Sequence, residues 1–247
     1  CEKRTGLTIA SRIKKFQTNI NYTLPNISPL APTRLVPWLV DPLAVSFLFD
    51  VHKNTLSPDE IQQTFLNYQA DHPQFRFVFT DGSKINDTTG IGIFSPGLAP
   101  TQMRLRNTTS IYYAELYAIF LALKLVQQNQ LRHACICSDS KSAIQSLKRL
   151  DISQHTQSNI LKLHQELFEG GIVIQFLWIP GHSNITGNER ADFYAKEALN
   201  LPDISETPLD HGSIRSSIKF HCLRLWQNTW NDIGMNTPLY QIKPQIK

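Results

Sequence analysis

The sequence predicts an α/β domain with a mixed five-stranded sheet, lying between an N-terminal and a C-terminal extension. Three strand-like segments follow one another at 75–79, 90–95 and 101–106, and short turns separate them. Two more apolar strands, at 134–138 and 172–178, alternate with segments of helical periodicity. Strands joined by short turns pair antiparallel, whereas strands joined through helices pair in parallel. We therefore expect three antiparallel strands followed by parallel strands, flanked by helices.

Composition limits the classes of protein that fit. A chain of 247 residues with 41% hydrophobic and 18% charged residues is typical of a globular protein. No run of 18 apolar residues is present, so we expect no membrane association, and the absence of a secretory signal favours an intracellular location, in cytoplasm or nucleus. The net charge of +4 permits a polyanionic partner without identifying one. Cys135 and Cys137 alternate in a strand and are expected to be buried free thiols.

Residues 1–70 are predicted to be a basic, proline-rich segment ahead of the domain. A basic helix is expected over 6–16, and the prolines at 25, 29, 32, 37 and 42 predict an extended linker. Ser57-Pro58-Asp59-Glu60 has the pattern of a helix start, with a serine cap and proline in the first turn. This helix leads into the domain, which we place at 71–200.

Within 71–200, the alternation of Phe75, Phe77 and Phe79 predicts the first strand, and Asp81-Gly82-Ser83 predicts a turn that ends it. Helices are expected from 111, over 140–150, over 153–169 and over 188–199. Residues 201–247 are expected to add an amphipathic helix, with Trp226 and Trp230 as packing residues.

Four acidic residues lie at strand ends and helix starts: Asp81, Glu115, Asp139 and Asp192. In open α/β sheets, functional groups gather at these positions, so the first three are expected to converge, and Asp192 to complete the cluster. Taken singly, each acid has an ordinary structural role as a turn residue, a helix cap or a partner of the helix dipole. Converging carboxylates repel one another, and a cation such as Mg²⁺ or Mn²⁺ compensates this charge. Two such ions about 4 Å apart can activate a water molecule and stabilise a leaving oxygen in phosphodiester cleavage.

The local sequences around these acids resemble type 1 ribonuclease H, in the form carried by polyproteins of jockey-like non-LTR retrotransposons. The matching stretches are Phe79-Thr80-Asp81-Gly82-Ser83, Ala114-Glu115-Leu116, Ser138-Asp139-Ser140 and, most specifically, the continuous segment WIPGHSNITGNERAD at 178–192. The resemblance spans about residues 75–200, roughly half of the chain.

This resemblance implies a ribonuclease H-like fold and hydrolysis of the RNA strand of RNA–DNA hybrids. It implies that two Mg²⁺ ions, or Mn²⁺, are bound by the four catalytic acids Asp81, Glu115, Asp139 and Asp192. His182 matches a loop histidine that assists the proton or product-release step. Ser83 and Ser140 are expected to touch the nucleic-acid backbone, and Asn188 a ribose hydroxyl. The resemblance also implies a covalently linked reverse transcriptase region upstream.

Two other functions fit parts of the pattern. A ribonuclease H-like module that binds nucleic acid without cutting it would not need all four acids, and all four are present. A DNA strand transferase on a related fold usually has its acids as Asp, Asp and a distant Glu, whereas Glu115 here lies between two strand-end aspartates. One departure from the family concerns Ile111, Tyr112 and Tyr113, which stand where many cellular members have asparagines that contact ribose.

Overall fold

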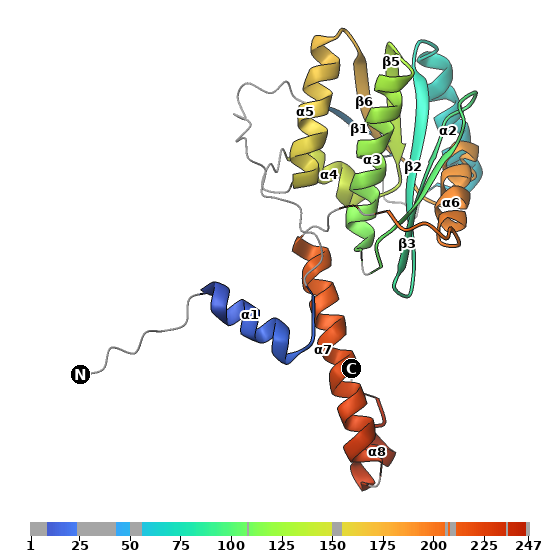
Figure 1. Cartoon of the computed structure of the whole chain (residues 1–247). Coiled ribbons are helices and arrows are strands. Elements are labelled where there is room, and N and C mark those ends of the chain that lie inside the picture. The colour runs from blue at the N-terminus through green and yellow to red at the C-terminus, as the bar shows by residue number, and fades with distance from the viewer. Residues whose placement is uncertain are drawn as a thin grey trace.

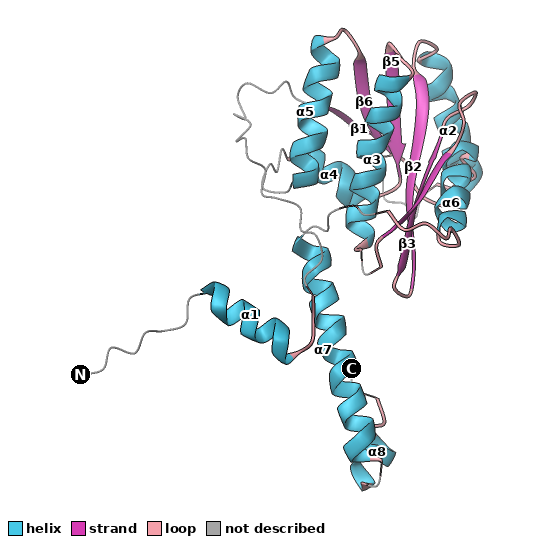
Figure 2. Ribbon diagram, in the orientation of Figure 1, coloured by secondary structure: helices cyan, strands magenta, loops and turns pink. Residues whose placement is uncertain are grey.

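The computed structural model of the chain describes residues 9–23, 43–49, 56–107, 109–149, 155–205, 207, 211–235 and 237–245. Its elements, in chain order, are α1 (Ile9–Asn19), β1 (Ala44–Phe47), α2 (Pro58–Asp71), β2 (Arg76–Ile85), β3 (Thr88–Phe94), β4 (Thr101–Leu105), α3 (Ile111–Gln128), β5 (His133–Ser138), α4 (Lys141–Lys148), α5 (His155–Glu169), β6 (Val173–Trp178), α6 (Thr186–Ala198), α7 (His211–Gly234) and α8 (Pro238–Ile242). The α/β class is therefore confirmed (Figure 2).

The sheet has six strands in the order β1-β6-β5-β2-β3-β4, one more than the five expected. As predicted, β2, β3 and β4 are antiparallel, and β5 and β6 continue the sheet in parallel. The additional strand, β1, pairs in parallel with β6, from Ala44 opposite Gln175 to Phe47 opposite Trp178. Gln175 Nε2 donates to Ser46 Oγ at 3.0 Å, and the Phe47 and Trp178 rings lie 6.3 Å apart. Residues that we assigned to the segment before the domain thus contribute a strand to its sheet.

β2 is longer than expected, because the sequence Asp81-Gly82-Ser83 does not form a turn. The strand continues to Ile85, which lies opposite Thr88 of β3, and Asp81 lies opposite Gly92. The reversal comes at Asn86, whose φ of 52° is in the left-handed region that asparagine tolerates well. Asp81 is consequently held in the middle of a paired strand rather than at a flexible strand end.

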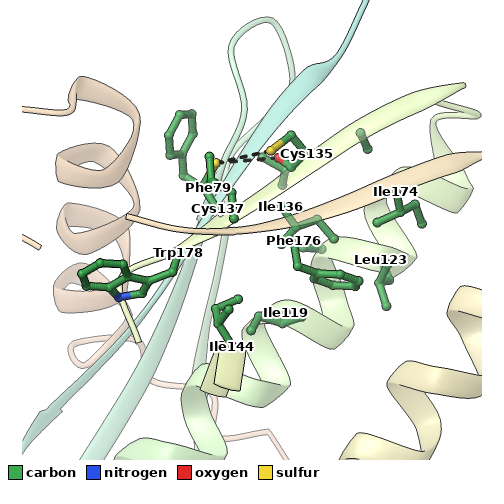
Figure 3. Close-up of a cluster of buried hydrophobic side chains, with 14 of the residues drawn as sticks. Phe79, Ile119, Leu123, Cys135, Ile136, Cys137, Ile144, Ile174, Phe176 and Trp178 are labelled. Atoms are coloured by element: carbon green, nitrogen blue, oxygen red, sulfur yellow. Dashed lines mark hydrogen bonds between the residues drawn. The ribbon is translucent and has the colours of Figure 1, made fainter. Parts of the chain in front are cut away.

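Helices cover both faces of the sheet (Figure 1). On one face, α3 packs with α5 over the central strands, and Phe176 of β6 points toward Ile119 and Leu123 of α3 (Figure 3). Phe176, Cys135 and Cys137 are fully buried, and both thiols are free, as expected. On the other face, α6 lies over β2 and β3, and Phe65 of α2 packs edge-on against the Phe77 and Phe79 rings. The helices on the two faces thus hold the sheet between them.

The predicted cap of α2 is confirmed. The Ser57 side chain accepts a hydrogen bond from the Glu60 backbone amide, and the Glu60 carboxylate accepts one from the Ser57 backbone amide at 2.7 Å. This reciprocal pair satisfies two amides that the helix start would otherwise leave without partners. The predicted proline-rich linker, at 25–42, lies outside the described residues.

Two helices from opposite ends of the chain meet beside the domain (Figure 1). The segment after α1 contacts α7 through Tyr22, whose hydroxyl lies 2.6 Å from Ser217 Oγ, and through the Ile20 carbonyl, 2.7 Å from His221 Nε2. The prediction that Trp226 packs in an interior is wrong, since Trp226 is 60% exposed on α7. No helix among the described residues has the length and apolar character needed to cross a membrane.

Candidate active site

Two neighbouring parallel strands bring Asp81 and Asp139 together. Thr80 of β2 lies opposite Ser138 of β5. The residues that follow them, Asp81 and Asp139, therefore occupy the next position along the two strands. Side chains at directly opposed positions point to the same face of a sheet. The register of β2 and β5 therefore places both carboxylates side by side at one end of the sheet.

Glu115 reaches this pair from α3. The helix begins after Ser110, whose Oγ accepts a hydrogen bond from the Tyr113 amide at 3.1 Å. Gly82, beside Asp81, lets the start of α3 lie close to β2: a Cβ at Gly82 would stand 3.2 Å from Ala114 Cβ and 3.3 Å from Glu115 Cδ. The absent side chain at Gly82 thus leaves room for the Glu115 carboxylate next to Asp81.

The three carboxylates form a compact group. One carboxylate oxygen from each of Asp81, Glu115 and Asp139 lies within 4.8 Å of the others. Asp81 and Glu115 are buried, and Asp139 is half-buried. The Glu115 Oε2 atom is buried without a hydrogen-bond partner among the described residues. A buried carboxylate oxygen without a donor is costly unless a cation meets it, and oxygen-only groups of this kind are the ligands that Mg²⁺ and Mn²⁺ prefer.

The electrostatics of this group show how strongly it favours a positive charge. Burial, and then the charges of Asp139 and Asp192, raises the pKa of Asp81 to about 8. Burial, and then the charges of Asp81 and Asp139, raises the pKa of Glu115 well above its usual range. Both shifts have the sign of carboxylates that repel one another in a poorly solvated site. A divalent cation bound between them would reverse this sign.

Asp192 faces the same group from α6 but is not one of the three acids in closest contact. Its charge raises the pKa of Asp81, and Lys196 Nζ lies 2.6 Å from its Oδ2. Lys196 is one turn further along α6, an i,i+4 arrangement that pairs charges on a helix face. Lys196 was not predicted as a site residue, although its i,i+4 spacing from Asp192 is a usable signal in the sequence.

Glycines in β3 let α6 approach closely enough to carry Asp192 to the site. A Cβ at Gly92 would overlap the Ala191 carbonyl oxygen and the Ala195 amide nitrogen of α6. Gly92 lies opposite Asp81 across the β2–β3 pair. The close contact between Gly92 and α6 therefore determines the position of Asp192 relative to Asp81.

Three groups hold Asp139 in place. Trp178 Nε1 donates to the Asp139 carbonyl at 3.0 Å, and Asn188 Nδ2 donates to its Oδ2 at 3.3 Å. A Cβ at Gly181 would stand 2.6 Å from the same Oδ2, so the loop after β6 lies directly against the carboxylate. The bond from Trp178 to Asp139 was not predicted from the sequence. Asn188, expected to contact a ribose hydroxyl, is buried beside Asp139.

The other predicted residues surround the carboxylates. His182 is exposed on the loop after β6, with a φ of 54° in the left-handed region. Ser140 is the N-cap of α4, and its Oγ accepts a hydrogen bond from the Ala143 amide at 3.4 Å. Ser83 is half-buried in β2, two residues beyond Asp81, opposite Gly90.

Comparison with known proteins matches the RNase H family model to residues 74–200, which is half of the chain and includes all four acids. The chain belongs to the RNase H family. Among solved structures, RNase H1 from the halophilic archaeon Halobacterium salinarum NRC-1 aligns with a TM-score of 0.40 and 20% sequence identity, over 51% of this chain and 97% of that chain. No curated protein sequence matches the chain.

Membership of the RNase H family gives the carboxylate group a chemical context. Members of the family bind RNA–DNA hybrids and generally use divalent metal ions. The acids of this RNase H domain meet the requirements of such an ion, because they are oxygen donors, converge within 4.8 Å and include a buried oxygen with no other partner among the described residues.

Proposed function

We propose that this chain is a ribonuclease H that cuts the RNA strand of RNA–DNA hybrids, with two divalent ions bound by Asp81, Glu115, Asp139 and Asp192. The observation that carries the proposal is the convergence of three of these acids on one point in a chain of the RNase H family. Mg²⁺ is the preferred ion and Mn²⁺ the alternative, because both favour oxygen ligands. Asp192, held by Lys196, completes the ligand set from the α6 side.

Different residues of the chain have different roles in the proposed hydrolysis. The ions, when bound, supply positive charge that activates a water molecule and stabilises the leaving oxygen. Asp81 and Asp139 define the reaction point through the strand register. The bond from Trp178 holds the Asp139 backbone, and the bond from Asn188 orients its carboxylate. His182, exposed on the adjacent loop, can carry a proton between the departing oxygen and solvent.

Contacts with the substrate backbone are assigned to Ser83 and Ser140, which lie next to the acids along β2 and after β5. A contact between Asn188 and a ribose stays a prediction, and the bond from its Nδ2 to Asp139 favours a positioning role. We further propose that residues 71–200 are the catalytic domain, that 1–70 are the end of a covalently linked upstream reverse transcriptase region of a retrotransposon polyprotein, and that 201–247 form a C-terminal helical segment. The resemblance of 178–192 to such polyproteins supports this context.

We expect the chain to discriminate by ribose and not by base sequence. The described residues around the acids include no helix or ribbon patterned to read base edges in a groove, whereas RNA differs from DNA through its 2′-hydroxyl and its helix shape. One sequence is prepared as RNA–DNA, RNA–RNA and DNA–DNA duplexes, together with hybrids of scrambled sequence, and cleavage is followed with Mg²⁺. Cutting confined to the RNA of every hybrid is the expected result. Cutting or joining of DNA–DNA would favour a strand transferase, and binding without cutting would favour a non-catalytic module.

Stability of the metal-free protein should fall as the pH rises from about 4 to about 8. The pKa of Asp81 is raised to about 8 and that of Glu115 is raised as well, so the folded state binds more protons than the unfolded state across this window. Divalent ions should therefore raise Tm more at pH 8 than at pH 5. An ion at 100 times its Kd adds about 2.7 kcal/mol, and each kcal/mol shifts Tm by about 2–4 °C in a chain of this size. Thermal melts with chelator, Mg²⁺ and Mn²⁺ measure the effect. An equal ion response at both pH values would contradict the assignment.

A further inference from the structure

We infer that the helical extension binds the phosphate backbone of the nucleic acid that the carboxylate site cuts, and so supplies the excess positive charge that the catalytic domain lacks. The helical extension is defined here as residues 9–23 and 211–245, which hold α1, α7 and α8. The inference rests on the proposed function for the identity of the substrate. It adds a binding site at a part of the chain outside the family match, which ends at residue 200.

The charges of the described residues are divided unequally between the two parts of the chain. The described residues within 56–205 include 12 Lys and Arg against 13 Asp and Glu, so the domain itself offers no excess of positive charge to a polyanion. The helical extension carries seven basic side chains against one acidic side chain, Asp232; the basic ones are Arg12, Lys14, Lys15, Arg215, Lys219, Arg224 and Lys243. The excess positive charge of the described residues thus lies in the helical extension.

These basic groups are free to meet a ligand. All seven side chains are exposed, and none takes part in an ion pair within the described ranges. Arg224 Nη2 lies 3.5 Å from His221 Nδ1. Arg215, Lys219 and Trp226 lie four and seven residues apart, a spacing that puts them on one face of α7. A basic face with an exposed aromatic ring fits a nucleic-acid backbone and an adjacent unpaired base.

The helical extension leaves the domain at the end that carries the acids. The Ser213 side chain, fully buried at the start of α7, accepts a hydrogen bond from the Ser110 amide at 2.9 Å. Ser110 is the N-cap of α3, and Glu115 is five residues further on, a rise of about 8 Å along the helix. Arg215 and Lys219 follow within about 9 Å of rise from Ser213 along α7. A duplex seated at the acids extends over distances of this order, since one helical turn is about 34–36 Å.

An anionic membrane is the other partner that a basic helix with exposed apolar residues could bind. The observations favour nucleic acid, because the helical extension begins beside the carboxylate site and α7 is anchored to the same helix that carries Glu115. Membrane binding would not account for the position of the basic helices at that end of the domain. Membrane binding is therefore one of the outcomes that the experiment distinguishes.

The test measures the binding of a labelled RNA–DNA hybrid to the full chain by fluorescence anisotropy, from 50 to 200 mM salt. The background is Asp81→Asn, so that the hybrid is not consumed. The variant adds Arg215→Ala and Lys219→Ala. Loss of two phosphate contacts should lower the slope of log K against log salt by about 2 and raise Kd about tenfold at low salt. The matched control removes two basic side chains from the domain, Lys124→Ala and Arg149→Ala, and should change both quantities much less.

A second variant protects the test against unfolding of α7. Arg215→Lys keeps the charge and should retain the affinity and salt slope of the background, with helicity measured by circular dichroism. Unchanged binding by the double alanine variant, an equal loss in the domain control, or charge-dependent binding to phosphatidylserine vesicles but not to hybrid would overturn the inference. Cleavage of hybrid by the unmodified chain tests the proposed function separately. A hybrid that is bound through the helical extension but not cut would overturn only the proposed function.

Discussion

Substitution of Asp81 by asparagine is expected to reduce the rate of RNA strand cleavage by about three orders of magnitude or more. The change keeps the shape of the side chain. It removes one of the three neighbouring negative charges that we propose bind a cation. Metal ions supply several kcal/mol of charge stabilisation, and each 1.36 kcal/mol corresponds to a factor of ten in rate. Single-turnover cleavage of a labelled hybrid with Mg²⁺ measures the loss. Asp139→Asn should behave in the same way.

The same substitution should not destabilise the metal-free protein. Because Asp81 is buried beside Asp139 and Asp192, a neutral amide relieves repulsion, so Tm with chelator should stay equal or rise. The increase in Tm with Mg²⁺ should shrink or disappear. Asp71→Asn, at the exposed end of α2, is the matched control and should leave cleavage unchanged. Near-normal turnover by Asp81→Asn would show that the reaction is centred elsewhere.

Substitution of Gly92 by alanine should damage both stability and activity, although residue 92 contributes no reacting group. The new Cβ would overlap backbone atoms of Ala191 and Ala195, so α6 must move away from β3. Overpacking of this kind costs about 1–3 kcal/mol, or more where backbone must shift. α6 carries Asp192, and a displacement of about 1 Å can cost about 100-fold in rate. Urea unfolding and cleavage kinetics measure the two effects.

A matched glycine separates this effect from a general cost of adding a methyl group. Gly170, just after α5, would place its Cβ 3.3 Å from the Leu167 carbonyl and has no contact with α6. Gly170→Ala should therefore keep normal cleavage. If Gly92→Ala were as stable and as active as Gly170→Ala, α6 would not be held at the distance from β3 that the structure shows.

The sequence was most informative where one local pattern decides the structure. The alternation from Phe75 to Phe79 predicted a strand, and Ser57 with Glu60 predicted a capped helix, because both depend on neighbours within a few residues. The extent of β2 could not be predicted in this way. Asp-Gly is typical of a turn, but pairing with β3 carries Asp81 and Gly82 through as strand, and the reversal falls at Asn86. Tertiary pairing outweighed local turn chemistry.

The candidate site, like the fold, was predictable only where the signal in the sequence is local. The four acids were identified from their local sequences, but nothing local indicated that Asn188 or Trp178 would bond to Asp139. The Trp178 bond depends on the β5–β6 register, which places Trp178 opposite Ser138, and the Asn188 bond depends on the position of α6 beside the end of β5. Trp226 was misjudged because its helical spacing from Trp230 suggested a packed face, whereas no described element covers it. β1 was missed because four residues beside a proline-rich stretch carry too little periodicity to stand out.

β1 also determines where this protein can be divided. The family match begins at residue 74, after both β1 and α2, so the evolutionary unit is shorter than the folding unit. Without β1, the strand β6 would present a row of unpaired amides and carbonyls along the four residues from Gln175 to Trp178, which include Phe176. Open, apolar strand edges recruit further strands from other molecules. In the whole chain that edge is occupied by a strand of only four residues, which is too short to template aggregation itself.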